Sequence, residues 1–196
     1  MAELTVIVGC MFSGKSEELL RLLKRAAIAR LSTVVIQPTT DTRTVGRVCS
    51  RDGRCVDAVV VRDARAIPST AGLYDVVGID EAQFFDEHLL SAIHELYAAG
   101  KRLIIAGLDT DYRGERFGYM DQIMAIPEAR IVKLRAVCMR CGEEATRTFR
   151  KSGAGAQVEI GDGDKYEALC YSCYRLASER VTAPNPTAAA AQRVLA

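Results

Sequence analysis

An eight-residue segment near the N-terminus has the residue types and spacing of a phosphate-binding loop. Gly9–Ser16 matches the pattern G-x-x-x-x-G-K-[ST] at every fixed position, between an apolar run and a helical pattern. In that setting backbone N–H groups converge on phosphate oxygens at a helix N-terminus, the lysine reaches the terminal phosphates, and the serine binds Mg²⁺. The alternative, a glycine-rich turn with an exposed lysine, does not require the strand-to-helix context. The predicted nucleotide-binding residues are Gly9, Met11, Phe12, Ser13, Gly14, Lys15 and Ser16.

Two acids follow a later apolar run and complete the expected chemistry. Val76–Ile79 is followed directly by Asp80 and Glu81. A phosphate-binding loop needs an acid at the end of a neighbouring strand to hold the metal, and Asp80 fits that role. Successive residues leaving a strand point to different sides, so Glu81 can face an acceptor alcohol and remove its proton during phosphoryl transfer. The alternative is that Glu81 is a helix-cap neighbour or a surface acid.

Four cysteines form two C-x-x-C pairs separated by 28 residues. Tetrahedral zinc favours four thiolates, and each pair can present both sulfurs from one turn, so we predict a structural zinc site. Cys10, Cys49 and Cys55 lack such spacing and are interpreted as small buried or incidental residues, as are His88 and His94. The predicted zinc ligands are Cys138, Cys141, Cys170 and Cys173.

Strands and helices alternate from residue 4 to about residue 134. Such alternation is typical of an α/β fold with a doubly wound, mainly parallel sheet. Beyond it, 136 to about 176 shows no strong amphipathic helix, and the end of the chain is rich in alanine and proline. We therefore predict a P-loop α/β domain at 1–135, a zinc-binding domain at 136–181 and a flexible tail at 182–196. The expected strands are 4–8, 33–37, 58–61, 76–79, 102–106 and 131–134, with a helix at 87–99.

Composition limits the partners and the compartment. In 196 residues, 26 Lys and Arg oppose 25 Asp and Glu, so no global field favours nucleic acid or acidic membranes. No stretch has the length of a membrane span or the pattern of a signal peptide, so we predict a cytoplasmic protein in which disulfides are disfavoured. The basic residues between Arg130 and Lys151 are interpreted as a solvated face, because nearby acids dilute them.

Several motifs, taken in chain order, resemble the type II thymidine kinases. They are G-x-M-F-S-G-K-S, then D-T-R at 41–43, then I-D-E-A-Q-F-F at 79–85, followed by Gly107-Leu108-Asp109, Phe117-Gly118 and Asp164-Lys165-Tyr166. The resemblance spans residues 4 to about 176. It implies a RecA-like P-loop domain, a zinc-binding lasso domain, transfer of the ATP γ-phosphoryl group to thymidine, a homotetramer, and inhibition by thymidine triphosphate (dTTP).

The resemblance also assigns roles residue by residue. Glu81 resembles the catalytic base and Asp80 the metal-side acid, while Arg43 resembles a residue that aligns acceptor and phosphates beside Asp41. Backbone groups of the lasso would read the pyrimidine edge. The implied thymidine pocket comprises Met11, Asp41, Phe84, Leu108, Tyr112, Phe117, Val158, Glu159, Ile160, Gly161 and Tyr166.

Two positions depart from that family's pattern. Cys10 stands where proline is usual, which removes a rigid turn residue and predicts a more mobile or thiol-sensitive loop entry. Tyr112 stands where phenylalanine is common, and its hydroxyl needs a partner if buried.

The same motifs are also compatible with a second function. In a nucleic-acid-dependent P-loop ATPase, the acid pair would activate water and the zinc ribbon would grip a strand. The absence of a long basic face argues against it.

Overall fold

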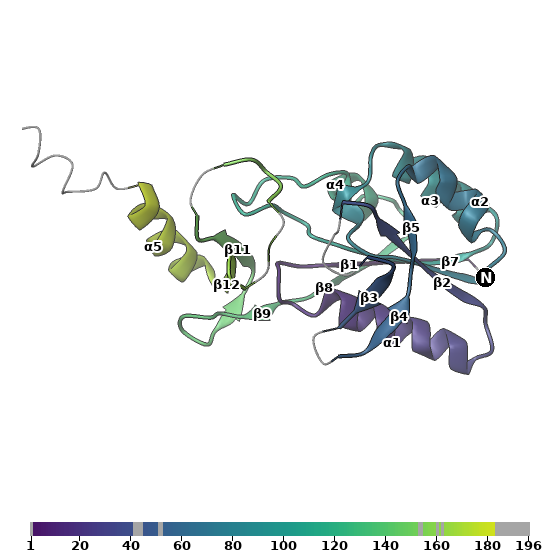
Figure 1. The fold of residues 1–196 in the computed structure, drawn as a ribbon, viewed down its shortest axis with the longest axis horizontal. Coiled ribbons are helices and arrows are strands. Elements are labelled where there is room, and N and C mark those ends of the chain that lie inside the picture. The colour runs from purple at the N-terminus through teal and green to yellow at the C-terminus, as the bar shows by residue number, and fades with distance from the viewer. Residues whose placement is uncertain are drawn as a thin grey trace, which may run out of the picture.

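Six strands form one central sheet. The computed structural model describes residues 2–40, 45–50, 53–152, 155–159, 161 and 163–182, with the side chains of 181 and 182 excepted. The strand order is β5-β2-β6-β7-β1-β8, and every neighbouring pair is parallel (Figure 1). This confirms the predicted strands and the mainly parallel α/β sheet. The strands are β1 (Glu3–Val8), β2 (Thr33–Pro38), β5 (Val59–Val61), β6 (Val76–Ile79), β7 (Arg102–Gly107) and β8 (Ala129–Lys133).

Helices cover both faces of the sheet. One face packs against α1 (Lys15–Ile28), and the other packs against α2 (Ile67–Ala71), α3 (His88–Ala98) and α4 (Met120–Met124) (Figure 1). The central strands are buried on both faces, which explains why β1 and β7 are nearly continuous apolar runs. Helix α3 confirms the predicted helix at 87–99 to within a residue at each end.

The first helix packs closely on β6 because that strand contains a glycine. A Cβ atom on Gly78 would lie 3.0 Å from Cδ1 of Leu23 and 3.1 Å from Cδ1 of Leu19. Both leucines are buried, so a larger residue would push α1 away from the sheet. Because α1 begins directly at the phosphate-binding segment, this packing fixes that segment relative to the sheet.

The strand order differs in one respect from the sequence prediction. The acid-bearing β6 is not the direct neighbour of β1, because β7 lies between them. Parallel strands place their carboxyl ends at the same edge, so the segments that follow β1, β6 and β7 still meet there. A hairpin of β3 (Arg47–Cys49) and β4 (Cys55–Asp57) was not predicted.

A smaller unit follows the sheet. It contains two antiparallel pairs, β9 (Ala136–Val137) with β10 (Glu144–Ala145) and β11 (Arg147–Arg150) with β12 (Tyr166–Leu169). The chain then forms helix α5 (Tyr171–Thr182) (Figure 1). This helix was not predicted, because its apolar stripe is weak: Ala177 is its one fully buried apolar residue among those described, and Tyr174 is only partly buried. Residues 183–196, most of the predicted tail, lie outside the described residues.

The basic segment is only partly the solvated face that we predicted. Arg140 pairs with Glu167 at 2.9 Å, Lys133 pairs with Asp109 at 2.8 Å, and Arg135 pairs with Glu144. Arg150 contradicts the prediction, since it is 2% exposed and packs inside the molecule.

Within the described part of the chain, every helix is too short or too polar to cross a lipid bilayer.

Candidate active site

The segment after β1 has the backbone of a tight loop. Gly14 has φ 82° and immediately precedes α1, while Phe12, although not a glycine, has φ 69°. A Cβ atom on Gly9 would lie 2.5 Å from the carbonyl oxygen of Leu134, so only glycine fits there. The loop is thereby held against β8 and directs its backbone towards the N-terminus of α1, where helix geometry leaves N–H groups free to bind an anion.

Lys15 and Ser16 begin α1 and face the acids of β6. The Ser16 hydroxyl donates to Oδ2 of Asp80 at 2.9 Å, and Lys15 Nζ donates to the carbonyl oxygen of Cys10 at 3.0 Å. Burial lowers the pKa of Lys15, opposed by the negative charges of Glu81 and Asp80. Burial and the charge of Glu81 raise the pKa of Asp80 to about 7, against the lowering effect of the Ser16 hydrogen bond. A hydroxyl beside a carboxylate offers the oxygen ligands that Mg²⁺ prefers.

Glu81 is held in place by a residue that sequence analysis did not single out. Gln83 donates from Nε2 to Oε2 of Glu81 at 2.5 Å and accepts at Oε1 from the backbone N–H of Leu108 at 3.0 Å. Gln83 is 3% exposed and lies in a 3-10 turn, Ala82–Phe84. It therefore ties the acid after β6 to the residue after β7. A glutamine two positions after the acid was visible in the sequence, but its partner across the sheet was not.

The backbone of Glu81 is itself unusual. Its φ of 49° and ψ of 42° place a non-glycine residue in the left-handed region. This conformation costs about 1–3 kcal/mol, and such residues gather at functional sites. The strained turn directs Glu81 into a cavity, which its side chain helps to line.

That cavity has a volume of about 330 Å³, at the lower end of the range for small-molecule sites. Its walls come from the phosphate loop, the ends of β6 and β7, the β3–β4 hairpin and the segment before β12. The rings of Phe84 and Phe117 meet edge to face at 5.6 Å between centroids. Among the predicted site residues it is lined by Met11, Phe12, Gly14, Lys15, Ser16, Asp80, Glu81, Phe84, Leu108, Tyr112, Phe117, Val158, Glu159, Gly161 and Tyr166.

The remaining predicted site residues are not among the described walls of the cavity. Gly9 and Ser13 shape the phosphate loop without lining the cavity, while Asp41, Arg43 and Ile160 fall outside the described residues. The cavity also has walls that the sequence did not predict. They are Glu17, Thr40, Val48, Cys49, Ser50, Thr110, Asp111, Thr148 and Gln157.

Residues 155–159 are held by hydrogen bonds and an ion pair on both sides. The Tyr166 hydroxyl donates to the carbonyl oxygen of Glu159 at 2.6 Å, and Lys165 pairs with the Glu159 side chain at 3.1 Å. On the other side, Nε2 of Gln157 donates to Oδ2 of Asp111 at 3.1 Å. The segment thus forms a wall between β12 and the loop after β7.

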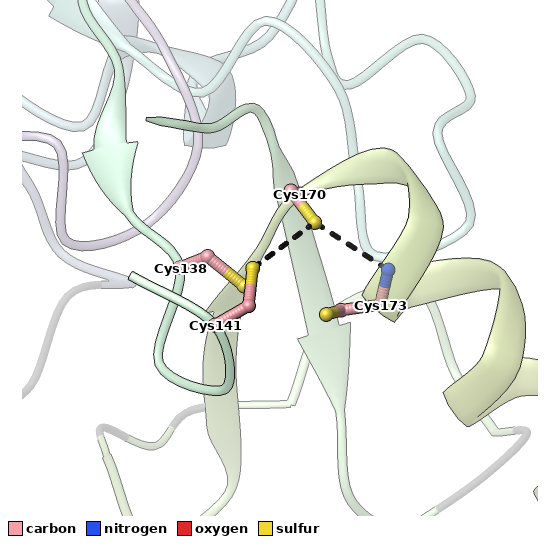
Figure 2. A group of neighbouring side chains, drawn as sticks. All are labelled: Cys138, Cys141, Cys170 and Cys173. Carbon is pink, nitrogen blue, oxygen red and sulfur yellow. Dashed lines mark hydrogen bonds between the residues drawn. The ribbon is translucent and has the colours of Figure 1, made fainter. Parts of the chain in front are cut away.

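The four predicted zinc ligands come together. Figure 2 shows Cys138 and Cys141 in the turn after β9 facing Cys170 and Cys173 at the start of α5. Their sulfur atoms all lie within 4.8 Å of one another. Burial acts to raise the pKa of Cys138, but hydrogen bonds from nearby backbone groups lower it to about 6, which favours the thiolate that zinc binds. Four converging sulfurs on two elements fit a closed structural zinc site.

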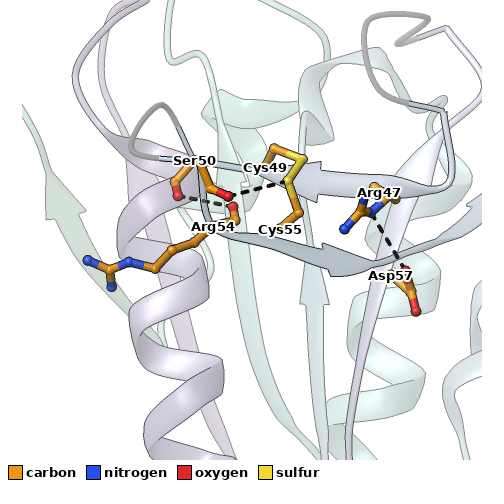
Figure 3. The surroundings of a disulfide bond; sticks show 7 residues. Arg47, Cys49, Ser50, Arg54, Cys55 and Asp57 are labelled. Carbon is orange, nitrogen blue, oxygen red and sulfur yellow. Dashed lines mark hydrogen bonds and ion pairs between the residues drawn. A yellow bond between two sulfur atoms is a disulfide. The ribbon is translucent and has the colours of Figure 1, made fainter.

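The remaining cysteines differ in part from the prediction. Cys49 and Cys55 face each other across the β3–β4 hairpin and form a disulfide (Figure 3), so their interpretation as incidental residues is wrong. The expectation that disulfides are disfavoured in this protein does not hold for this pair. The sequence showed only a six-residue separation, which does not reveal a hairpin. Cys10 is 2% exposed, as a small buried residue should be, and burial raises the pKa of its thiol, which disfavours the reactive thiolate.

A glycine-rich loop with Lys15 and Ser16, an adjacent acid pair and a cavity at the carboxyl edge of a parallel sheet are typical of a P-loop phosphoryl-transfer enzyme. The chain matches the family model described as thymidine kinase over residues 2–174. It is 44% identical to the thymidine kinase of Porphyromonas gingivalis, over 88% of this chain and 85% of that one. It is 45% identical to the thymidine kinase of Coprothermobacter proteolyticus, over 85% of this chain and 87% of that one. It is 43% identical to the thymidine kinase of Deinococcus radiodurans, over 94% of this chain and 95% of that one. The chain belongs to the thymidine kinase family.

Proposed function

We propose that this enzyme transfers the γ-phosphoryl group of ATP to the 5′-hydroxyl of thymidine, and also of deoxyuridine, giving the nucleoside monophosphate and ADP. The observation that carries the proposal is the position of Glu81. Glu81 lines the same cavity as Lys15 and Ser16, so one space adjoins a phosphate-binding loop and a candidate base. Membership of the family supplies the identity of the acceptor.

In the proposed mechanism, Glu81 accepts the proton of the acceptor hydroxyl as the oxygen attacks the γ-phosphorus. Loss of the proton makes the oxygen a better nucleophile, and Gln83 keeps the carboxylate oriented towards it. Lys15 exchanges its hydrogen bond to the Cys10 carbonyl for one to the terminal phosphates and offsets their charge. Ser16 and Asp80 would hold Mg²⁺, which neutralises charge on the phosphate oxygens when bound.

The nucleoside side of the cavity is assigned from its walls. We propose that the base lies between Met11, Phe84 and Phe117, beneath the segment that contains Val158 and Glu159. With the nucleoside bound beneath this segment, water would be kept from the γ-phosphorus, where it would otherwise take the phosphoryl group and waste ATP. Arg43 and Asp41 keep the roles that the family resemblance implies.

We also propose the finer architecture and assembly that the family resemblance implies. The domains are a doubly wound, RecA-like P-loop domain at 1–135 and a zinc-binding lasso domain at 136–181. The division is supported by the second unit's own core, to which, of the described residues, the first domain adds only Cys10 and Phe12 from its loop. The enzyme would be a cytoplasmic homotetramer inhibited by dTTP, without nucleic-acid partners. Light scattering and inhibition assays test the assembly and the inhibitor.

Labelled ATP distinguishes this function from a nucleic-acid-dependent ATPase. Thymidine, deoxycytidine and single-stranded DNA are offered separately with [γ-³²P]ATP. We expect labelled thymidine monophosphate in the first reaction and no stimulation by DNA. Hydrolysis that DNA stimulates, without any labelled monophosphate, would reject the kinase.

The base is tested by replacing Glu81 with its neutral isostere. We expect Glu81→Gln to retain ATP binding and to lose most of the turnover, because the amide cannot accept the proton. Unchanged turnover would remove Glu81 from this role.

A further inference from the structure

The hydroxyl group of Tyr112 holds the wall of the cavity through three hydrogen bonds. It donates to the carbonyl oxygen of Gly155 at 3.0 Å, and it accepts from the backbone N–H of Gly155 at 3.3 Å and from Nε of Arg113 at 2.8 Å. A hydroxyl has one donor and two acceptor sites, so all of its capacity is used. A phenylalanine ring could make none of these bonds.

Two arginines reinforce the same contact. Arg113 donates from Nη2 to the carbonyl oxygen of Gly155 at 2.7 Å, so this oxygen accepts from both neighbouring side chains. The Arg150 guanidinium lies 3.8 Å from the centroid of the Tyr112 ring and donates to the carbonyl oxygen of Ala156 at 2.6 Å. Arg150 is 2% exposed and its bond to Ala156 is partly buried, whereas the bonds that Tyr112 and Arg113 make to Gly155 lie at the surface.

Gly155 suits this position because it has no side chain. A Cβ atom there would lie 2.8 Å from Nη2 of Arg150. Arg150 is buried and already engaged with Tyr112 and Ala156, so it has little room to withdraw. Gly155 therefore lets two segments that are 43 residues apart in the sequence pack closely against each other.

The contact lies next to residues that line the cavity. Val158 and Glu159 follow Gly155 within four residues, and both contribute to the cavity wall, as does Tyr112 itself. Tyr174 donates from its hydroxyl to the backbone carbonyl of Tyr112 at 2.8 Å, which ties the same loop to α5. Movement of Gly155 would thus shift the wall that covers the nucleoside side.

We propose that Tyr112 and Arg113 form a latch that fixes residues 155–159 over the nucleoside, so that Tyr112 acts as a positioning residue for nucleoside binding. The inference rests on the proposed function, in which this wall covers the base. In the latch the hydroxyl and the guanidinium act together on one peptide group. Its effect falls on the affinity for the nucleoside, because the hydrogen bonds described for these two side chains go to Gly155 and to each other, while Tyr174 bonds the backbone of Tyr112.

Tyr112→Phe tests the latch because it removes only the hydroxyl group and keeps the ring against Arg150. We expect the KM for thymidine to rise about three- to tenfold, the equivalent of about one net hydrogen bond. The KM for ATP and kcat should stay within about twofold, because the phosphate loop and Glu81 are untouched. Tyr119→Phe is the matched control, since the Tyr119 hydroxyl bonds Glu87 and lies outside the cavity wall.

Hydrogen exchange gives a second readout that does not depend on the substrate. The backbone amides of residues 155–159 should exchange faster in Tyr112→Phe than in the wild type or in Tyr119→Phe. In a double-mutant cycle with Arg113→Ala, the two changes should be less than additive, because they remove parts of one contact.

The results distinguish a failure of the latch from a failure of the proposed function. An unchanged thymidine KM together with unchanged exchange would overturn the latch, and so would equal increases in the KM values for thymidine and ATP, which indicate general loosening. If the wild type makes no thymidine monophosphate, the proposed function fails, while the exchange comparison still decides whether the hydroxyl holds the segment.

Discussion

Gln83 provides the sharpest test of how the fold positions Glu81, the proposed base. Replacing it with methionine keeps a similar volume but removes the amide. The variant loses a 2.5 Å hydrogen bond to the Glu81 carboxylate and leaves the Leu108 N–H without its present acceptor. A bond to a charged group contributes about 1.5–3 kcal/mol, and an unsatisfied buried donor costs about 1–3 kcal/mol. We therefore expect Gln83→Met to lower the free energy of unfolding by about 3 kcal/mol.

The same change should affect catalysis more than binding. If the bond to Glu81 orients the base in the transition state, losing 1.5–3 kcal/mol lowers kcat by about ten- to a hundredfold. The KM values for thymidine and ATP should change little, because Gln83 does not line the cavity. Gln122→Met, on the exposed side of α4, is the control and should alter neither stability nor kcat. Urea unfolding and steady-state kinetics measure both effects, and a normal kcat in a correctly folded Gln83→Met would refute the reasoning.

Two further predictions concern the cysteines. Metal analysis should find one zinc per chain, and its removal by a chelator should lower the melting temperature. It should also raise the KM for thymidine more than that for ATP, because the cysteine pairs flank the segment that we propose to cover the nucleoside. The zinc assignment is wrong if the chain melts identically with and without chelator after complete metal removal. The double variant Cys49→Ser/Cys55→Ser should lower the free energy of unfolding by about 2 kcal/mol, as expected for opening so short a loop. If the double variant and the wild type have equal free energies of unfolding in urea, the disulfide does not constrain the unfolded chain.

Local patterns were sufficient to predict the sheet and much of the site. The strands of the sheet are buried apolar runs, and short runs of this kind bounded by loops are visible without any tertiary information. The phosphate loop and the acid pair follow such runs directly, so predicting the strands also placed Lys15 and Asp80 at the same edge. The cysteine cluster was predictable because zinc chemistry constrains both the residue type and the spacing.

Contacts between distant segments were not predictable in the same way. The bond between Gln83 and Leu108 depends on β7 lying next to β6, and no local pattern determines strand order. The β3–β4 hairpin has three residues in each strand, too few to show periodicity, so the pairing of its cysteines was hidden. Arg150 resembled other basic residues in sequence, and its burial arises from aromatic and backbone partners on other segments.

Cys10 and Met11 give the phosphate loop a second attachment, to the unit that follows the sheet. The Met11 N–H donates to Oγ1 of Thr148 at 3.0 Å, and Cys10 packs with Ala145 and Cys138 in the small core of the unit that follows the sheet. The start of the phosphate loop therefore packs into the core of the unit that follows the sheet. A truncated chain ending near residue 135 would expose this loop to water on that side and remove its hydrogen-bond partner. We therefore expect such a truncated chain to bind nucleotides differently from the whole enzyme.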